Sequence, residues 1–126
     1  MVKVVIDSSV LIQNIRLGRE VFFELVEAVK QKKVEVLVPT VVLMEIWSGK
    51  SMNNKSLEKK IVERLAPFTK IACDEKVACL SGEIRRNYGI NGLDAIIAAT
   101  TLDNRAKLLT LNKKHFKMIK ELKFYE

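Results

Sequence analysis

The sequence predicts an α/β fold in which helices flank a central, mainly parallel sheet. Short apolar runs rich in β-branched residues, each bounded by polar or turn residues, are typical of buried strands. Between these runs apolar residues recur at helical spacing, and strands that alternate with amphipathic helices favour a parallel sheet covered on both faces. The length of 126 residues and the 48% hydrophobic content fit one domain, residues 1–126, with its own core.

The first strand is expected at Val4–Ile6, where the apolar run stops at Asp7. Asp7 then stands at the carboxyl end of a strand, which is where ligands bind in open α/β sheets. A short helix is predicted over Val10–Ile15. A second helix is predicted between Arg19 and Lys32, because apolar residues recur there at helical spacing: Phe22, Leu25, Val26 and Val29.

A second buried strand is predicted at Val36–Val38, broken by Pro39. Proline suits the first turn of a helix and Thr40 can cap free amides, so a helix is expected from there to about Gly49. The single acid on this very apolar helix is Glu45. Ionised carboxylates are rarely buried unless they are paired or bound to metal, so Glu45 is expected to have a partner.

The middle of the chain predicts a polar, basic loop over residues 48–60, leading into a helix with three inward residues: Leu57, Ile61 and Leu65. Pro67 interrupts this pattern, and Phe68–Ala72 is either a short strand or an extended connection. Asp74 is a good cap for a helix that runs to about Tyr88.

The last third of the chain predicts a helix over Leu93–Thr101 that is apolar on nearly every side, with Asp94 in its first turn. A buried strand is expected at Lys107–Leu111, ending at Asn112. Residues 113–120 predict a basic turn or short helix, and Leu122–Tyr125 predicts a final strand.

Composition narrows the classes of function. Lys and Arg number 22 against 15 Asp and Glu, and the net charge of +7 fits either an anionic partner or a merely solvated basic surface. Cys73 and Cys79 lack the spacing of a redox pair or a zinc site, so we expect buried structural thiols. No signal peptide is recognisable and no apolar run approaches the ~20 residues of a membrane span, which predicts a cytoplasmic protein.

Three acids and one amide are predicted at the same edge of the sheet: Asp7, Glu45, Asp94 and Asn112. Two carboxylates ~4 Å apart repel by roughly 4 kcal/mol at an effective dielectric near 20, so three ionised acids need a cation or a raised pKa. Hard oxygen ligands select Mg²⁺ or Mn²⁺ over zinc. Such sites commonly serve phosphoryl transfer, and a basic chain would gather a polyanionic substrate.

The same residues resemble a PIN domain, especially the VapC-like toxin ribonucleases. The similarity rests on Asp7-Ser8-Ser9 after an apolar strand, VLMEIWSG around Glu45, GLDAIIAAT around Asp94, and LLTLNKKHF, and it spans essentially the whole chain. It implies a three-layer αβα fold, a metal-dependent endoribonuclease acting on RNA, a homodimer, and inhibition by a cognate antitoxin.

Residue by residue, Asp7, Glu45 and Asp94 match the family's acidic metal ligands. The resemblance further implies that Ser9 is a small hydroxyl residue that hydrogen-bonds within the site. Thr110 matches the threonine that usually precedes the fourth ligand position.

The chain departs from the family at Asn112, where many members have aspartate. Asparagine keeps an acceptor oxygen but loses a charge, so a second metal should bind more weakly and a single metal is expected without substrate. Other members also place an acid where this chain has His115. We expect an ordinary surface histidine there, although contact with a phosphate is the alternative.

Other interpretations stay open. Taken singly, Asp7 could cap the following helix, Asp94 could stabilise a helix start, and Glu45 could bond a buried backbone group or an arginine. Haloacid-dehalogenase-like phosphatases also begin with a strand and an aspartate, but they need a second aspartate where Ser9 stands. A binding module that has lost cleavage through Asn112, or an RNA-processing nuclease outside a toxin-antitoxin pair, would share the same sequence features.

Overall fold

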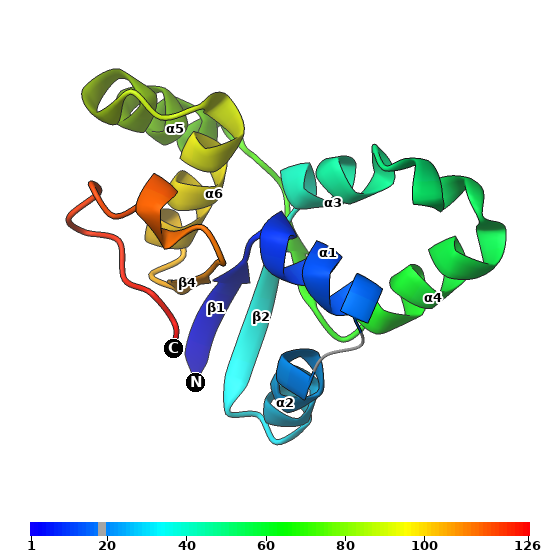
Figure 1. The fold of residues 1–126 in the computed structure, drawn as a ribbon. Coiled ribbons are helices and arrows are strands. Elements are labelled where there is room, and N and C mark those ends of the chain that lie inside the picture. Colours follow the sequence, from blue (N-terminus) through cyan, green and yellow to red (C-terminus); the bar gives the residue numbers. More distant parts are fainter. Residues whose placement is uncertain (18–19) are drawn as a thin grey trace.

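The computed structural model describes residues 1–17 and 20–126, and it contains a four-stranded parallel sheet between helices (Figure 1). The strand order is β3-β2-β1-β4. The strands are β1 (Val2–Ile6), β2 (Val34–Pro39), β3 (Thr69–Ile71) and β4 (Lys107–Leu109). Every neighbouring pair is parallel, which confirms the predicted α/β class.

Helices cover both faces of the sheet and form a three-layer αβα arrangement. The helices are α1 (Ser8–Leu17), α2 (Glu20–Lys30), α3 (Thr40–Trp47), α4 (Lys55–Leu65), α5 (Glu75–Tyr88) and α6 (Gly92–Asp103). Figure 1 shows α5 and α6 on one side of the sheet and α1, α2 and α4 on the other. The general preference of parallel strands for right-handed crossovers accounts for this division, because β4 lies on the opposite side of β1 from β2 and β3.

The core lies on both sides of the central strand β1. Val4, Val5 and Ile6 are fully buried, as are Ile97 and neighbouring residues of α6. A strand buried on both faces needs a nearly continuous apolar sequence, and that run ends where the next residue is acidic. Burial of β1 therefore fixes the position of Asp7 at the carboxyl end of the sheet.

Two local predictions in the middle of the chain are confirmed. The extended segment after Pro67 is the edge strand β3, which pairs with β2 from Thr69 to Ile71. Asp74 caps α5, since its Oδ1 accepts a hydrogen bond from Val77 N at 2.9 Å. The same helix ends at Tyr88, and its C-cap residue Gly89 has a left-handed φ of 67°, which glycine adopts without strain.

The carboxyl-terminal strands were predicted too long. β4 ends at Leu109 instead of Leu111, and the expected strand at Leu122–Tyr125 is reduced to one bridge between Leu108 and Phe124. Leu108 exchanges two backbone hydrogen bonds with this segment, and a strand of three residues offers room for little more. The basic stretch after Asn112 contains a single 3₁₀ turn, η2 (Lys113–His115).

The prediction of buried thiols was wrong, because Cys73 and Cys79 are both exposed. Cys73 lies in the connection between β3 and α5. Cys79 lies on the outer face of α5, whose buried face carries Val77, Ser81 and Ile84. Apolar neighbours in the sequence did not show that Cys73 lies in a connection or that Cys79 takes the outer face of α5.

Two predicted helix starts differ from the structure or fall outside it. Pro39 itself is the N-cap of α3, with extended ψ of 137° and no side-chain cap hydrogen bond, so Thr40 is the first helical residue and does not cap. α3 ends at Trp47, two residues before the expected Gly49. The predicted start of the second helix, Arg19, lies outside the described residues.

Within the described ranges no helix is both long and apolar enough to cross a membrane.

Replacement of the α5 cap tests the local account of this fold. We expect Asp74→Ala to lower the free energy of unfolding by about 1 kcal/mol, because the amide of Val77 loses its acceptor. Urea denaturation followed by circular dichroism measures the change. Glu83→Ala, at an exposed position of the same helix, is the matched control and should change stability by less than ~0.5 kcal/mol. Equal losses in both variants would contradict the cap.

Candidate active site

Asp7 follows β1 directly and is held by hydroxyl groups. It is only 4% exposed. Its Oδ2 accepts hydrogen bonds from Ser9 Oγ at 3.0 Å and Thr110 Oγ1 at 2.7 Å, and Ser8 Oγ lies 3.4 Å from Oδ1. Hydrogen bonds to an ionised acceptor are stronger than neutral ones, so this buried carboxylate has a fixed orientation.

Ser9 and Thr110 also connect Asp7 to the chain that follows β4. Ser9 Oγ accepts a hydrogen bond from Leu111 N at 3.2 Å, and Thr110 Oγ1 accepts one from Asn112 N at 3.0 Å. Each hydroxyl therefore donates to the carboxylate and accepts from a backbone amide. The result is a rigid link between the ends of β1 and β4.

Glu45 lies on α3 and carries an unsatisfied oxygen. Its Oε1 is buried and has no hydrogen-bond partner among the described residues. Burial, followed by the negative charges of Asp7 and Asp94, raises the pKa of this carboxyl above its ordinary value, although the Ser8 hydroxyl acts in the opposite direction. If a backbone group or an arginine paired with Glu45, Oε1 would have a hydrogen-bond partner, and it has none among the described residues.

Asp94 lies in the first turn of α6 and is held by Asn91. The Oδ1 of Asn91, the N-cap residue, accepts from Asp94 N at 2.9 Å, while its Nδ2 donates to Asp94 Oδ2 at 2.9 Å. This reciprocal pair resembles a capping box. Burial and then the charge of Asp7 raise the pKa of Asp94, and contacts with Asn91 and His115 partly offset the shift.

The fourth corner of the site, the predicted fourth ligand position, contains Asn112 and, three residues later, His115. Asn112 is partly buried and immediately precedes η2. His115 Nδ1 is 3.5 Å from Asp94 Oδ2, and the histidine side chain is 48% exposed. Sequence reasoning expected a surface histidine and missed its contact with Asp94. Its position three residues after Asn112 was the available signal.

The structure brings the three predicted acids within electrostatic reach of one another, but it does not arrange them as a finished ligand cage. The pKa of Glu45 responds to Asp7 and Asp94, and that of Asp94 responds to Asp7. Across residues 1–17 and 20–126, no three His, Cys, Asp or Glu side chains are close enough to hold a metal ion as they stand. The acids would have to move closer together around a cation.

The chemistry of the residues fits a hard divalent cation. Glu45 Oε1 is a buried acceptor without a donor, and two of the three carboxyls have raised pKa values, which means that their charges lack compensation. Mg²⁺ and Mn²⁺ prefer carboxylate oxygens, and no cysteine or second histidine competes for the position.

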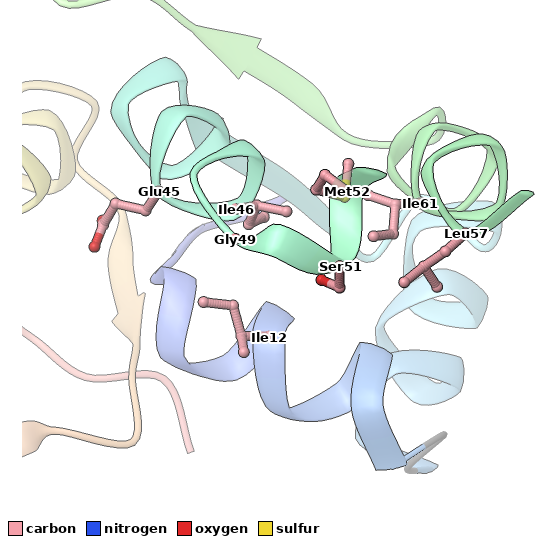
Figure 2. A pocket seen from close by; sticks show the side chains of 8 residues that line it. All are labelled: Ile12, Glu45, Ile46, Gly49, Ser51, Met52, Leu57 and Ile61. Atoms are coloured by element: carbon pink, nitrogen blue, oxygen red, sulfur yellow. The ribbon is translucent and has the colours of Figure 1, made fainter. Parts of the chain in front are cut away.

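An apolar pocket of about 320 Å³ opens beside Glu45 and away from the other two acids. Figure 2 shows Glu45 at one end, with its carboxylate directed away from the apolar side chains. The remaining lining comes from α1, α3, η1 (Lys50–Asn53) with its N-cap Gly49, and α4: Ile12, Ile46, Gly49, Ser51, Met52, Leu57 and Ile61. The pocket is thus an apolar surface adjoining the acids, and it is not the place where they converge.

Comparisons with known proteins agree with this architecture. A family model described as PIN domain matches residues 4–122. A chain of the Rickettsia felis VapBC2 complex, bound to a promoter DNA fragment, is 22% identical over 98% of this chain and 97% of that one, with a TM-score of 0.87. A chain of DNA-bound VapBC from Salmonella typhimurium is 19% identical over 99% and 98%, with a TM-score of 0.86.

A third similar structure is a toxin-antitoxin complex from Klebsiella pneumoniae. The matching chain is 26% identical, 98% of each chain is covered, and the TM-score is 0.75. A search among curated proteins found no match. At these identities the structures establish a shared fold.

Because the charge of Glu45 has no counter-charge in the metal-free protein, we expect Glu45→Gln to raise the melting temperature by roughly 2–4 °C at pH 7.5. The amide removes a poorly solvated charge and can donate to the neighbouring carboxylates. Thermal unfolding in EDTA measures the effect. Glu63→Gln, exposed on α4, is the control and should leave the melting temperature unchanged.

The gain should depend on pH in a defined direction. Because the pKa of Glu45 is higher in the folded than in the unfolded state, its ionisation penalises folding above the folded pKa. As the pH falls through that value the native wild type takes up the proton, and the advantage of Glu45→Gln should shrink. An advantage that grows towards low pH would contradict this account of Glu45.

Proposed function

Because the chain belongs to the PIN domain family, a family of nucleases, we propose that it is a metal-dependent endoribonuclease and the toxin of a toxin-antitoxin pair. The reaction is hydrolysis of an RNA phosphodiester bond. The family match covers nearly the whole chain and supports the nuclease class. The finer assignment rests on Asp7, Glu45 and Asp94, which lie within electrostatic reach of one another.

Glu45 supports this proposal most directly. Its buried, unpartnered Oε1 lies on the same side of the fold as Asp7 and Asp94, whose charges it senses. Leaving a buried acceptor unsatisfied costs roughly 1–3 kcal/mol, so such a group in a folded protein is typical of a site that binds something. A divalent cation is the partner that satisfies a cluster of acids.

Asp7, Glu45 and Asp94 would hold Mg²⁺ or Mn²⁺. The cation would supply Lewis acidity, which favours ionisation of a bound water and offsets charge on the phosphate. Ser9 and Thr110 orient Asp7, while Asn91 orients Asp94. The amide of Asn112 would contribute a neutral acceptor at the fourth corner, suited to a water or a ribose hydroxyl.

The charge of the chain supports RNA as the substrate. The net charge is +7, and Lys113, Lys114 and Lys117 are exposed in and just after the turn that adjoins Asp94. Cationic side chains beside an acidic centre attract phosphates on either side of the bond to be cut. Hydrolysis of cellular RNA is consistent with a cytoplasmic protein.

An antitoxin is the protein partner that we propose. Two of the similar structures are VapBC complexes and a third is a toxin-antitoxin complex. The apolar pocket offers a partner a surface that ends at Glu45, so a segment bound there would also cover one of the acids. We further propose a homodimer, for which the half-exposed Met44 and Trp47 of α3 offer apolar contact area.

Substitution of Asp94 tests the nuclease assignment. We expect Asp94→Asn to lower Mn²⁺-dependent cleavage of a structured RNA by more than about 100-fold, because a carboxylate ligand is replaced by a neutral amide. Gel analysis of a labelled RNA, with and without EDTA, measures the rate. Circular dichroism should show an unchanged fold.

The matched control is Asp103→Asn, which removes an acid at the other end of the same helix and breaks only its surface ion pair with Lys76. This variant should cleave at the wild-type rate. Wild-type activity in Asp94→Asn would remove Asp94 from the site. No Mn²⁺-dependent cleavage by the wild type on any RNA would instead favour a binding module.

The neighbouring reading frame in the genome tests the toxin assignment. We expect a short adjacent frame encoding a DNA-binding protein whose co-expressed product binds this chain and suppresses its RNA cleavage. An active nuclease with no such neighbour would support an RNA-processing role outside a toxin-antitoxin pair.

A further inference from the structure

His115 is fixed beside the acid cluster by the turn that carries it. Its backbone N–H donates to the carbonyl of Asn112 at 2.9 Å, and the next residue, Phe116, is fully buried. The imidazole Nδ1 faces Asp94 Oδ2 at 3.5 Å. Burial of the following side chain therefore fixes the backbone of His115 beside Asp94.

Asp94 has one oxygen that is already engaged. Its Oδ2 accepts from Asn91 Nδ2 at 2.9 Å and also faces the ring of His115. The other oxygen, Oδ1, is therefore the one free to join Asp7 and Glu45 around a cation. Two cations about 3.5–4 Å apart generally share a carboxylate, and a second one here would need the engaged Oδ2.

The chain around that second position offers cations and one neutral amide oxygen, that of Asn112. Residues 112–115 read Asn, Lys, Lys and His, so the turn contains no carboxylate and two full positive charges. Lys113 is drawn towards the carboxyl-terminal residue, with its Nζ 2.8 Å from Glu126 Oε1. A second divalent cation would meet a basic turn and the imidazole ring that faces Asp94 Oδ2.

We propose that His115 restricts this active site to a single divalent cation, because its ring occupies the flank of Asp94 that a second cation would use. The inference rests on the proposed function, since it presupposes that Asp7, Glu45 and Asp94 hold the first cation. His115 acts here as a positioning residue: with Asn91 it holds Asp94 so that one oxygen faces the other acids.

Replacing His115 by an acid should create a second cation site beside Asp94. In His115→Asp a second carboxylate would face Asp94 across a few ångströms, which is the arrangement that binds a hard cation. We expect isothermal titration with Mn²⁺ to give one site in the wild type and two in His115→Asp. The new site should be at least about tenfold tighter than any further binding to the wild type. His115→Glu, with a longer side chain, should behave alike and serves if the aspartate variant does not fold.

Lys114→Asp is the matched control. It places an acid on the same turn at an exposed position and changes the net charge by more, so it should still bind one Mn²⁺. Two sites in the wild type, one site in both folded His115 variants, or two sites in Lys114→Asp would each overturn the role of His115. No Mn²⁺ binding to the wild type would overturn the proposed metal site itself, so the two failures are distinguishable.

Discussion

A buried hydrogen bond between Thr110 and Asp7 joins the ends of β1 and β4 at the candidate active site. It is 2.7 Å long and joins residues 103 positions apart in the sequence. Thr110 also accepts from Asn112 N, so one hydroxyl fixes both the first acid and the fourth corner. This buried hydroxyl both donates to a carboxylate and accepts from an amide, and its loss would remove a hydrogen bond from each of the two segments that follow β1 and β4. The placement of Asp7 relative to Asn112 depends on this link.

The partly buried acids of the candidate site destabilise the folded protein, whereas the apolar core stabilises it. The last three residues of β1 are fully buried, and they place Asp7 in a region where Asp94 and Glu45 are also partly buried. Their raised pKa values record the cost of holding negative charge there. A protein tolerates such a cost at a functional site, because a bound cation or substrate can offset it. The hydroxyls of Ser9 and Thr110 orient Asp7, and Asn91 orients Asp94. Glu45 Oε1, in contrast, has no hydrogen-bond donor among the described residues.

Much of this arrangement was predictable from the sequence, because it depends on local pattern. The apolar run before Asp7, the lone acid of the apolar α3, and Asp94 in the first turn of α6 indicated one edge of a parallel sheet. Features that depend on long-range packing were not predictable. The contact of His115 requires the 3₁₀ turn after Asn112, the exposure of Cys79 depends on which face of α5 packs inward, and Phe124 pairs at a single residue because β4 is short. The spacing of the acids, which is too wide for a finished cage, is also a matter of packing.

The central claim is that Asp7, Glu45 and Asp94 together hold one divalent cation. Crystals grown with Mn²⁺ and measured for its anomalous scattering test this claim most directly. The account predicts a single strong peak within about 2.0–2.4 Å of an oxygen from each of the three carboxylates, with Glu45 Oε1 among them. No peak at that edge of the sheet at saturating Mn²⁺, or a peak bound by other residues, would contradict it.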